Sequence, residues 1–125
     1  MKKDNIIHTK SYAFALRIIK LYKYLVAEKK EYVLSKQVLR SGTAIGALVK
    51  ESENAQSKAD FIHKLNIALK EANETEYWLM LLKDSDYISE ENFQSIHKDS
   101  VELIKILVSI VKTSRNNWKF KMENW

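Results

Sequence analysis

Residues 58–83 carry the most regular pattern of apolar and polar positions in the chain. Apolar and small side chains recur there at alternating steps of four and three residues, which is the spacing of a helix packed against other helices. This series consists of Phe61, Leu65, Ala68, Ala72, Thr75, Leu79 and Leu82. A second row on the same helix, Ile62, Leu69 and Met80, indicates contacts with more than one neighbour.

Helical periodicity divides the chain into four segments, at residues 9–29, 35–55, 57–84 and 89–115. The apolar arc of the first comprises Tyr12, Ala15, Ile18, Ile19, Tyr22, Leu25 and Val26, and is widened by Phe14 and Leu21. The inner face of the second comprises Val38, Gly42, Ile45, Val49 and Ser52. That of the fourth comprises Phe93, Ile96, Ser100, Leu103, Ile104, Leu107, Ile110 and Val111. We expect the last three helices to be capped by Ser35, Ser57 and Ser89.

The connections between these segments are short, and the chain contains no proline. Short connections make consecutive helices antiparallel neighbours. The sequence therefore predicts an all-α protein, with residues 1–115 forming an antiparallel up-down four-helix bundle and residues 116–125 an aromatic and basic tail. Trp118 and Phe120 favour docking of this tail on a neighbouring surface. Because the first and third helices carry more apolar surface than one bundle buries, we also expect a homo-oligomer.

The two glycines of the chain, Gly42 and Gly46, both lie inside the second predicted helix. Each costs about 1 kcal/mol relative to alanine at such a position. Their spacing places them on one face, which indicates that the backbone of another helix approaches closely there. A phosphate-binding loop is the alternative interpretation, but the pattern lacks both a preceding strand and a following Lys-Ser or Lys-Thr pair.

Composition narrows the classes of protein to consider. Without cysteine, the chain has no disulfide framework and no thiolate metal site. The N-terminus lacks the apolar core of a signal peptide. The longest apolar run, at 103–111, includes Lys105 and is far shorter than the roughly 20 residues that span a bilayer. We expect a soluble, cytoplasmic protein with no membrane partner.

Charge is unevenly distributed, at +7 over residues 1–40, −5 over 41–92 and +3 over 93–125. On the outer arc of the first helix the polar positions are almost all basic, and comprise Lys10, Arg17, Lys20, Lys23 and Tyr24. A basic face with an interleaved aromatic residue is able to bind an RNA or DNA backbone. The alternative is an ordinary solvated face, or one that faces the acidic 41–92 segment within the bundle or between subunits.

Catalytic and metal-binding patterns are weak. The three histidines, His8, His63 and His97, are isolated, no Glu-x-x-His pair of a di-iron bundle occurs, and nothing resembles a nucleophile with its base. We therefore expect no enzymatic activity, no cofactor and no metal. Glu71 lies at the edge of the apolar seam, and we expect it to form a buried ion pair with Arg40.

Two stretches, LRSGTAIGALVKES at 39–52 and DFIHKLNIALKEANETEYWL at 60–79, together resemble the bacterial family of 23S rRNA intervening-sequence proteins. The resemblance rests on Leu39, Arg40, Ser41, Gly42, Ile45 and Gly46 in the first stretch. In the second it rests on Phe61, Leu65, Ala68, Glu71, Glu74, Thr75, Tyr77, Trp78 and Leu79. The chain departs from the family pattern by having one arginine, Arg40, where a pair is usual, and Ala47–Leu48 where an asparagine is common.

The resemblance implies a left-handed four-helix bundle that assembles as a ring-like homopentamer without an accepted enzymatic activity. A similar protein is the accessory factor of diversity-generating retroelements, which binds nucleic acid and partners a reverse transcriptase. Two hypotheses follow for this chain: an oligomeric accessory protein that binds an RNA or DNA backbone, or a pentameric scaffold for another protein without nucleic-acid binding.

Overall fold

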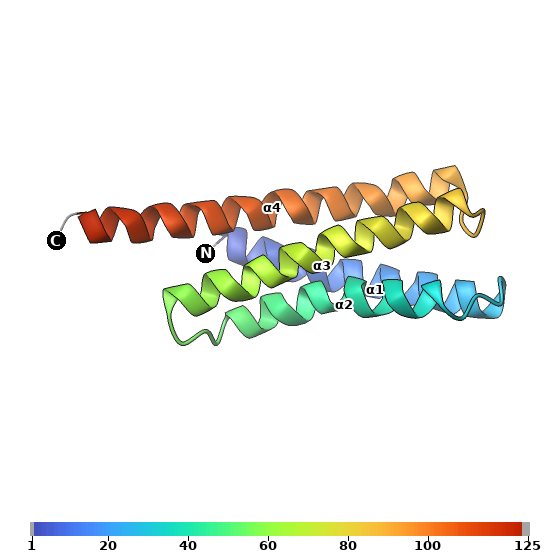
Figure 1. The fold of residues 1–125 in the computed structure, drawn as a ribbon, viewed down its shortest axis with the longest axis horizontal. Helices are drawn as coiled ribbons and strands as arrows, with labels where there is room; N and C mark the ends of the chain where they lie inside the picture. The colour runs from blue at the N-terminus through green and yellow to red at the C-terminus, as the bar shows by residue number, and fades with distance from the viewer. Residues whose placement is uncertain (1, 124–125) are drawn as a thin grey trace.

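The computed structural model describes the backbone of residues 2–123 and the side chains of residues 6–116. Its helices are α1 (Lys2–Ala27), α2 (Leu34–Ser52), α3 (Lys58–Asp84) and α4 (Glu90–Glu123). Consecutive helices run in opposite directions, and residues 2–123 contain no strand (Figure 1). The predicted all-α, up-down four-helix bundle is confirmed.

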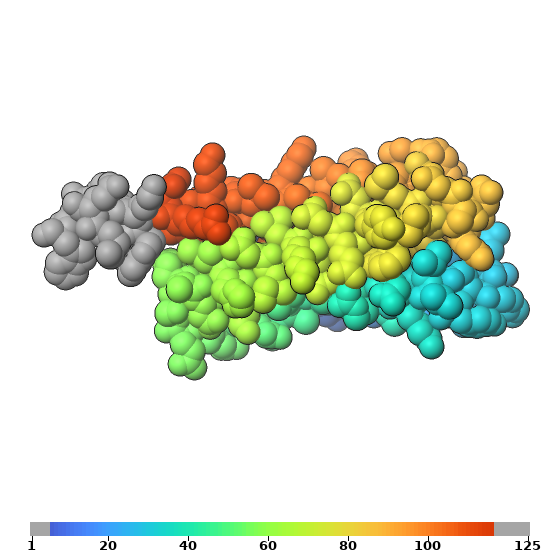
Figure 2. Space-filling view, viewed as in Figure 1, coloured from blue at the N-terminus to red at the C-terminus, as the bar shows by residue number. Residues whose placement is uncertain are grey.

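Each helix packs against two others, so that α1 lies diagonal to α3 and α2 lies diagonal to α4. The contact between α1 and α4 is the least extensive of the four. Figure 2 shows α3 and α4 side by side on one face of the molecule. At the end that holds the N-terminus and the α2–α3 connection, α4 projects past the other helices (Figure 1).

The core confirms the predicted seams of α2 and α3. In α3 the buried residues are Leu65, Ala68, Ala72, Thr75, Leu79 and Leu82, while Phe61 at the end of the series is half-buried. All five inner positions predicted for the second helix are buried in α2. In α4 the predicted inner positions are buried apart from Ile104, which is half-buried. None of the described helices is both long enough and apolar enough to cross a membrane.

The inner face of α1 matches the prediction only in part: Phe14, Ile18 and Leu25 are buried as expected. Its buried residues are Ile7, Ser11, Phe14, Ile18 and Leu25. Tyr12, which we expected to face inward, is 68% exposed. The apolar residues of this helix extend over so wide an arc that two stripes compete for the core. The observed stripe brings Ile18 against Gly42 and Ser11 against Gly46, where the absence of side chains on α2 leaves room for them.

Both glycines lie at the contact between α1 and α2, as their spacing predicted. A Cβ atom placed on Gly46 would lie 3.4 Å from the backbone oxygen of Ser11. One placed on Gly42 would lie 2.7 Å from Cγ1 of Ile18. The missing side chains therefore let α1 approach α2 closely, which offsets the low helix propensity of glycine.

Two of the three predicted N-caps are confirmed. Ser57 accepts a hydrogen bond from the N–H of Asp60, and Ser89 accepts one from the N–H of Asn92. Ser35 was expected to cap α2 but lies within its first turn. The carboxylate of Glu31 accepts the N–H groups there instead, at 3.2, 2.9 and 2.6 Å from Val33, Leu34 and Ser35 respectively. Glu31, four residues before Ser35, thus caps the N-terminus of α2 in place of the serine.

Two helix ends also differ from the prediction. α1 begins at Lys2 rather than near residue 9, and α4 continues to Glu123 rather than ending near Arg115. Neither region contains a proline or glycine that would interrupt the helix. The segment expected to form a separate tail is thus helical up to Glu123. Trp118 and Phe120 lie outside the residues whose side chains are described, so their docking stays a prediction.

Candidate functional site

The basic arc of α1 is partly occupied by contacts within the chain. One guanidinium nitrogen of Arg17 lies 2.8 Å from a carboxylate oxygen of Asp99 and donates to the backbone oxygen of Ser95 at 3.1 Å. The other donates to the hydroxyl of Ser95 at 3.0 Å. Lys10 pairs with Glu102 at 3.2 Å. These contacts fasten α1 to α4 and neutralise two of the four predicted cations.

This arrangement corrects one detail of the charge interpretation. The basic side chains of α1 do pair with acids of the same bundle, as the alternative interpretation allowed. The partners of Lys10 and Arg17, however, are Glu102 and Asp99 of α4, which belong to a net basic segment and not to the acidic 41–92 segment. Net charge per segment misses this because α1 neighbours α4 in space but not in sequence.

The other three residues of the predicted arc remain on the surface. Lys20 and Lys23 are exposed, and no carboxylate among the described residues lies within ion-pair distance of either. Tyr24, next to Lys23, is 39% exposed. Lys20, Lys23 and Tyr24 are thus available to a partner, whereas Lys10 and Arg17 are held in ion pairs within the chain.

A second set of free cations lies along α4 and was not predicted. Lys98, Lys105 and Lys112 are exposed and recur every seven residues, so they share one side of the helix. Within residues 6–116 none of them has a carboxylate partner. The seven-residue spacing is present in the sequence, but the neighbouring Asp99 and Glu102 made the net charge of this part of the helix look nearly neutral. Only the structure shows that α1 neutralises both acids.

Most carboxylates of the described chain are engaged internally. Acids pair with bases at Lys10–Glu102, Arg17–Asp99, Lys64–Glu51 and Lys83–Glu90, and with histidines at His8–Glu53 and His97–Glu76. Glu31 and Asp60 bind backbone N–H groups. Among the described residues, Glu28, Asp86 and Glu91 are the carboxylates without such a partner. The surface therefore presents many free lysines and few free acids.

The predicted pairing of Arg40 with Glu71 is confirmed and includes a second acid. Arg40 Nη1 lies 3.4 Å from Glu71 Oε1, and Nη2 lies 2.6 Å from Glu74 Oε2. The pair is not buried as expected, because the Arg40 side chain is 53% exposed. Glu71 Oε1 is itself buried and accepts no hydrogen bond.

Trp78 completes this cluster. Its indole N–H donates to Glu74 Oε2 at 3.2 Å, and its ring meets that of Tyr77 edge-on at 5.2 Å. Burial alone would raise the pKa of Glu74, but the hydrogen bond from Trp78 and the hydrogen bond and charge of Arg40 outweigh it and lower that pKa. Conversely, the hydrogen bond to Glu74 raises the pKa of Arg40. Together Arg40 of α2 and Glu71, Glu74 and Trp78 of α3 form a network that joins the two helices at the surface.

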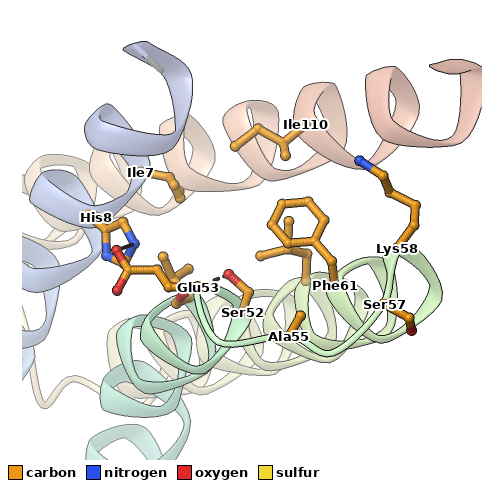
Figure 3. A pocket seen from close by; sticks show the side chains of 11 residues that line it. Ile7, His8, Ser52, Glu53, Ala55, Ser57, Lys58, Phe61 and Ile110 are labelled. Atoms are coloured by element: carbon orange, nitrogen blue, oxygen red, sulfur yellow. Dashed lines mark hydrogen bonds and ion pairs between the residues drawn. The ribbon is translucent and has the colours of Figure 1, made fainter. Parts of the chain in front are cut away.

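A cavity of about 490 Å³ opens at the end of the bundle (Figure 3). Phe61 of α3 lies opposite Ile110 of α4, and Ile7 of α1 lines one side (Figure 3). At the rim His8 Nε2 lies 2.6 Å from Glu53. The neighbouring hydroxyls serve the backbone instead, since Ser52 donates to the oxygen of Val49 and Ser57 caps α3. No nucleophile is bonded to a base here, and no cluster of metal ligands occurs among the described residues.

Most of the exposed large apolar side chains lie on two diagonal helices, α1 and α3. On α1 they include Tyr12 and Leu16, the latter 53% exposed. On α3 they include Tyr77 at 56% and Met80 at 45%. Because α1 and α3 are diagonal in the bundle, these two patches face away from each other. Such surfaces on a small protein commonly mark contacts with another protein.

Comparison with known proteins agrees with this fold. Residues 3–109 match the sequence profile of the family described as 23S rRNA-intervening sequence protein. A crystal structure of a protein with unknown function from the S23 ribosomal protein family of Bacteroides thetaiotaomicron is similar, with a TM-score of 0.87 and 63% identity. The match covers 88% of this chain and 98% of that one. No curated protein matches the sequence. The chain belongs to the family of 23S rRNA-intervening sequence proteins.

Proposed function

We propose that this chain is a non-enzymatic, self-associating protein that binds the backbone of RNA or DNA through cations on α1 and α4. The observation that carries the proposal is the imbalance of free charges. The carboxylates are largely engaged within the bundle, whereas Lys20 and Lys23 on α1 and the three lysines on α4 are not. Free cations along exposed helices are what a phosphate backbone requires.

Self-association supports such binding. The two apolar patches on α1 and α3 face in different directions, and a ring needs two different contact surfaces on each subunit. Five copies are expected from the family resemblance. A closed ring repeats every cationic patch, so that weak single contacts act together through effective concentration.

The test is the salt dependence of binding to a labelled RNA, measured by fluorescence anisotropy at several KCl concentrations. We expect the logarithm of affinity to fall linearly with the logarithm of salt concentration. Replacing Lys98, Lys105 and Lys112 by Gln leaves up to three phosphates of a duplex without a cation. The slope should then become shallower by up to about 0.9 for each of those phosphates. The double variant Lys20→Glu with Lys23→Glu should also bind the RNA more weakly than the parent.

The matched control is Lys36→Glu with Lys70→Glu, which changes the net charge equally on α2 and α3. If this control weakens binding as much as Lys20→Glu with Lys23→Glu, the effect is one of net charge and not of a defined surface. If the intact assembly binds no nucleic acid at low salt, the proposal is wrong.

A second candidate is a scaffold for another protein without nucleic-acid binding. It is favoured by the internal pairing of Lys10 and Arg17, which removes two cations from the proposed surface. The exposed apolar residues on α1 and α3 would then serve both assembly and partner binding. An intact oligomer that fails to bind RNA or DNA at low salt would favour this candidate.

A further inference from the structure

A shallow cleft of about 230 Å³ lies between α1 and α4, at the least extensive contact of the bundle. From α1 it is lined by Arg17, Lys20, Leu21 and Tyr24. From α4 it is lined by Asn92 and Ile96, which lie one turn apart on the same face of the helix, and from the residues just before α4 by Ile88. None of the residues that line the cleft belongs to the network around Arg40.

The lining combines an apolar floor with a cationic edge. Ile88 and Ile96 are buried, and Leu21 packs against the same core. Arg17 is fixed by Asp99 and Ser95, whereas Lys20 is exposed without a carboxylate partner among the described residues. No acidic side chain lines the cleft. An occupant should therefore have a flat or apolar part for the floor and a negative charge for Lys20.

The size of the cleft suggests what the occupant is. Sites that enclose a whole small molecule usually measure roughly 300–1,000 Å³, so this one is suited to a single ring system projecting from a larger molecule. Tyr24 offers a partly exposed aromatic ring, and Asn92, which lines the same cleft, offers an amide donor and acceptor. Aromatic rings beside cations are the usual means by which proteins bind unpaired bases.

We infer that the α1–α4 cleft takes one unpaired base of a single-stranded nucleic acid, with the adjoining phosphate at Lys20. This inference rests on the proposed nucleic-acid binding and makes it specific to single strands. In a duplex the bases are stacked and paired, so none can enter the cleft, and only the free lysines would contact it. The positive charge of the lining suits a nucleic acid and an acidic peptide equally. The aromatic ring of Tyr24 is the feature that favours a nucleic acid, and the test therefore replaces this residue.

The test compares a labelled single-stranded RNA with the same RNA in a duplex, at one salt concentration and with the full chain. We expect tighter binding of the single strand. Tyr24→Ala should weaken it by about 10-fold, the effect of losing one stacked base, and leave duplex binding unchanged. Tyr24→Phe should bind as the parent. Tyr32→Ala, which removes an exposed tyrosine in the α1–α2 connection, is the control and should have no effect.

The possible outcomes separate the two proposals. If single strand and duplex bind equally, or Tyr24→Ala weakens both alike, the inference is overturned while nucleic-acid binding stands. If neither RNA binds to an intact, helical oligomer, the proposed function itself fails. If an acidic, leucine-containing peptide binds and depends on Tyr24 while RNA binding does not, the cleft is a protein-binding site and the inference is again wrong.

Discussion

The side chain of Ile18 in α1 occupies the space that a side chain on Gly42 in α2 would need. A Cβ atom on Gly42 would lie 2.7, 2.9 and 3.0 Å from the Cγ1, Cγ2 and Cδ1 atoms of Ile18. Distances below 3.0 Å essentially never occur between packed carbon atoms, so α1 or Ile18 would have to move. Gly46, one turn further along the same face, meets only the backbone and hydroxyl of Ser11, at 3.4 Å or more.

The first prediction follows from this difference. Gly42→Ala should destabilise the protein by roughly 1–3 kcal/mol through overpacking, despite a gain of about 1 kcal/mol in helix propensity. Gly46→Ala gains the same propensity with little strain and should be neutral or stabilising. Urea unfolding at a fixed protein concentration measures both. Equal effects of the two substitutions would show that Ile18 does not limit the α1–α2 contact.

The second prediction concerns Glu31, whose carboxylate accepts three backbone N–H groups at the start of α2. Burial would raise the pKa of Glu31, but the hydrogen bonds from Leu34, Ser35 and Val33 together lower it. A lowered folded-state pKa means that the carboxylate stabilises the protein above its unfolded-state pKa. That stabilisation is lost as the pH falls through the folded-state pKa.

Glu31→Gln should therefore cost about 1 kcal/mol at pH 7, and the difference from the parent should shrink as the pH falls below about 4. Thermal unfolding across this pH range is the measurement. Glu28→Gln is the control, because it makes the same charge change at an exposed carboxylate with no partner among the described residues. An equal, pH-independent loss in both variants would mean that Glu31 does not cap α2.

The sequence predicted the buried residues correctly where the apolar residues form one narrow stripe on the helix. In α3 the alternating steps of four and three allow one inner stripe, and its residues from Leu65 to Leu82 are buried. In α1 apolar residues surround most of the helix, so periodicity alone could not choose between the stripe of Tyr12 and that of Phe14. Packing against Gly42 and Gly46 made the choice, and this contact is not local in sequence.

The candidate site shows the same limit. The pairing of Arg40 with Glu71 was predictable because both flank recognisable seams of neighbouring helices. Arg17 and Asp99, which pair between the first and last helices, are 82 residues apart in the sequence. No local sequence pattern predicts a contact over that separation. For that reason the sequence overestimated the basic face of α1 and missed the free lysines of α4.

The third prediction concerns assembly. Light scattering should give a mass several times that of the 14.7 kDa chain, and a monomer at micromolar concentration would contradict the proposed oligomer. If the α1 patch of one subunit contacts the α3 patch of the next, Leu16→Glu and Met80→Glu should each give monomers. An equimolar mixture of the two variants retains one intact contact and should form heterodimers only.

The outcome for the mixture discriminates between interface types. If each patch instead pairs with its own copy, each variant alone keeps one interface and remains a homodimer. Val33→Glu, at an exposed apolar residue in the α1–α2 connection, is the control for adding charge to the surface. Should this variant also dissociate the oligomer, the two patches are not the specific contacts.

The last prediction tests whether Arg17 is a packing residue or a binding residue. Arg17→Glu would remove its hydrogen bonds to Ser95 and place a second carboxylate beside Asp99. Because the pair is partly solvated, we expect a loss of only about 1 kcal/mol in the free energy of unfolding. Lys20→Glu, one turn along the helix at a free lysine, should leave stability unchanged. Arg17→Glu combined with Asp99→Arg restores opposite charges and should regain part of the loss, which a double-mutant cycle quantifies. If Arg17→Glu left stability unaltered yet weakened RNA binding as strongly as Lys20→Glu, the contact with Asp99 would not hold α1 to α4, and Arg17 would belong to the binding surface after all.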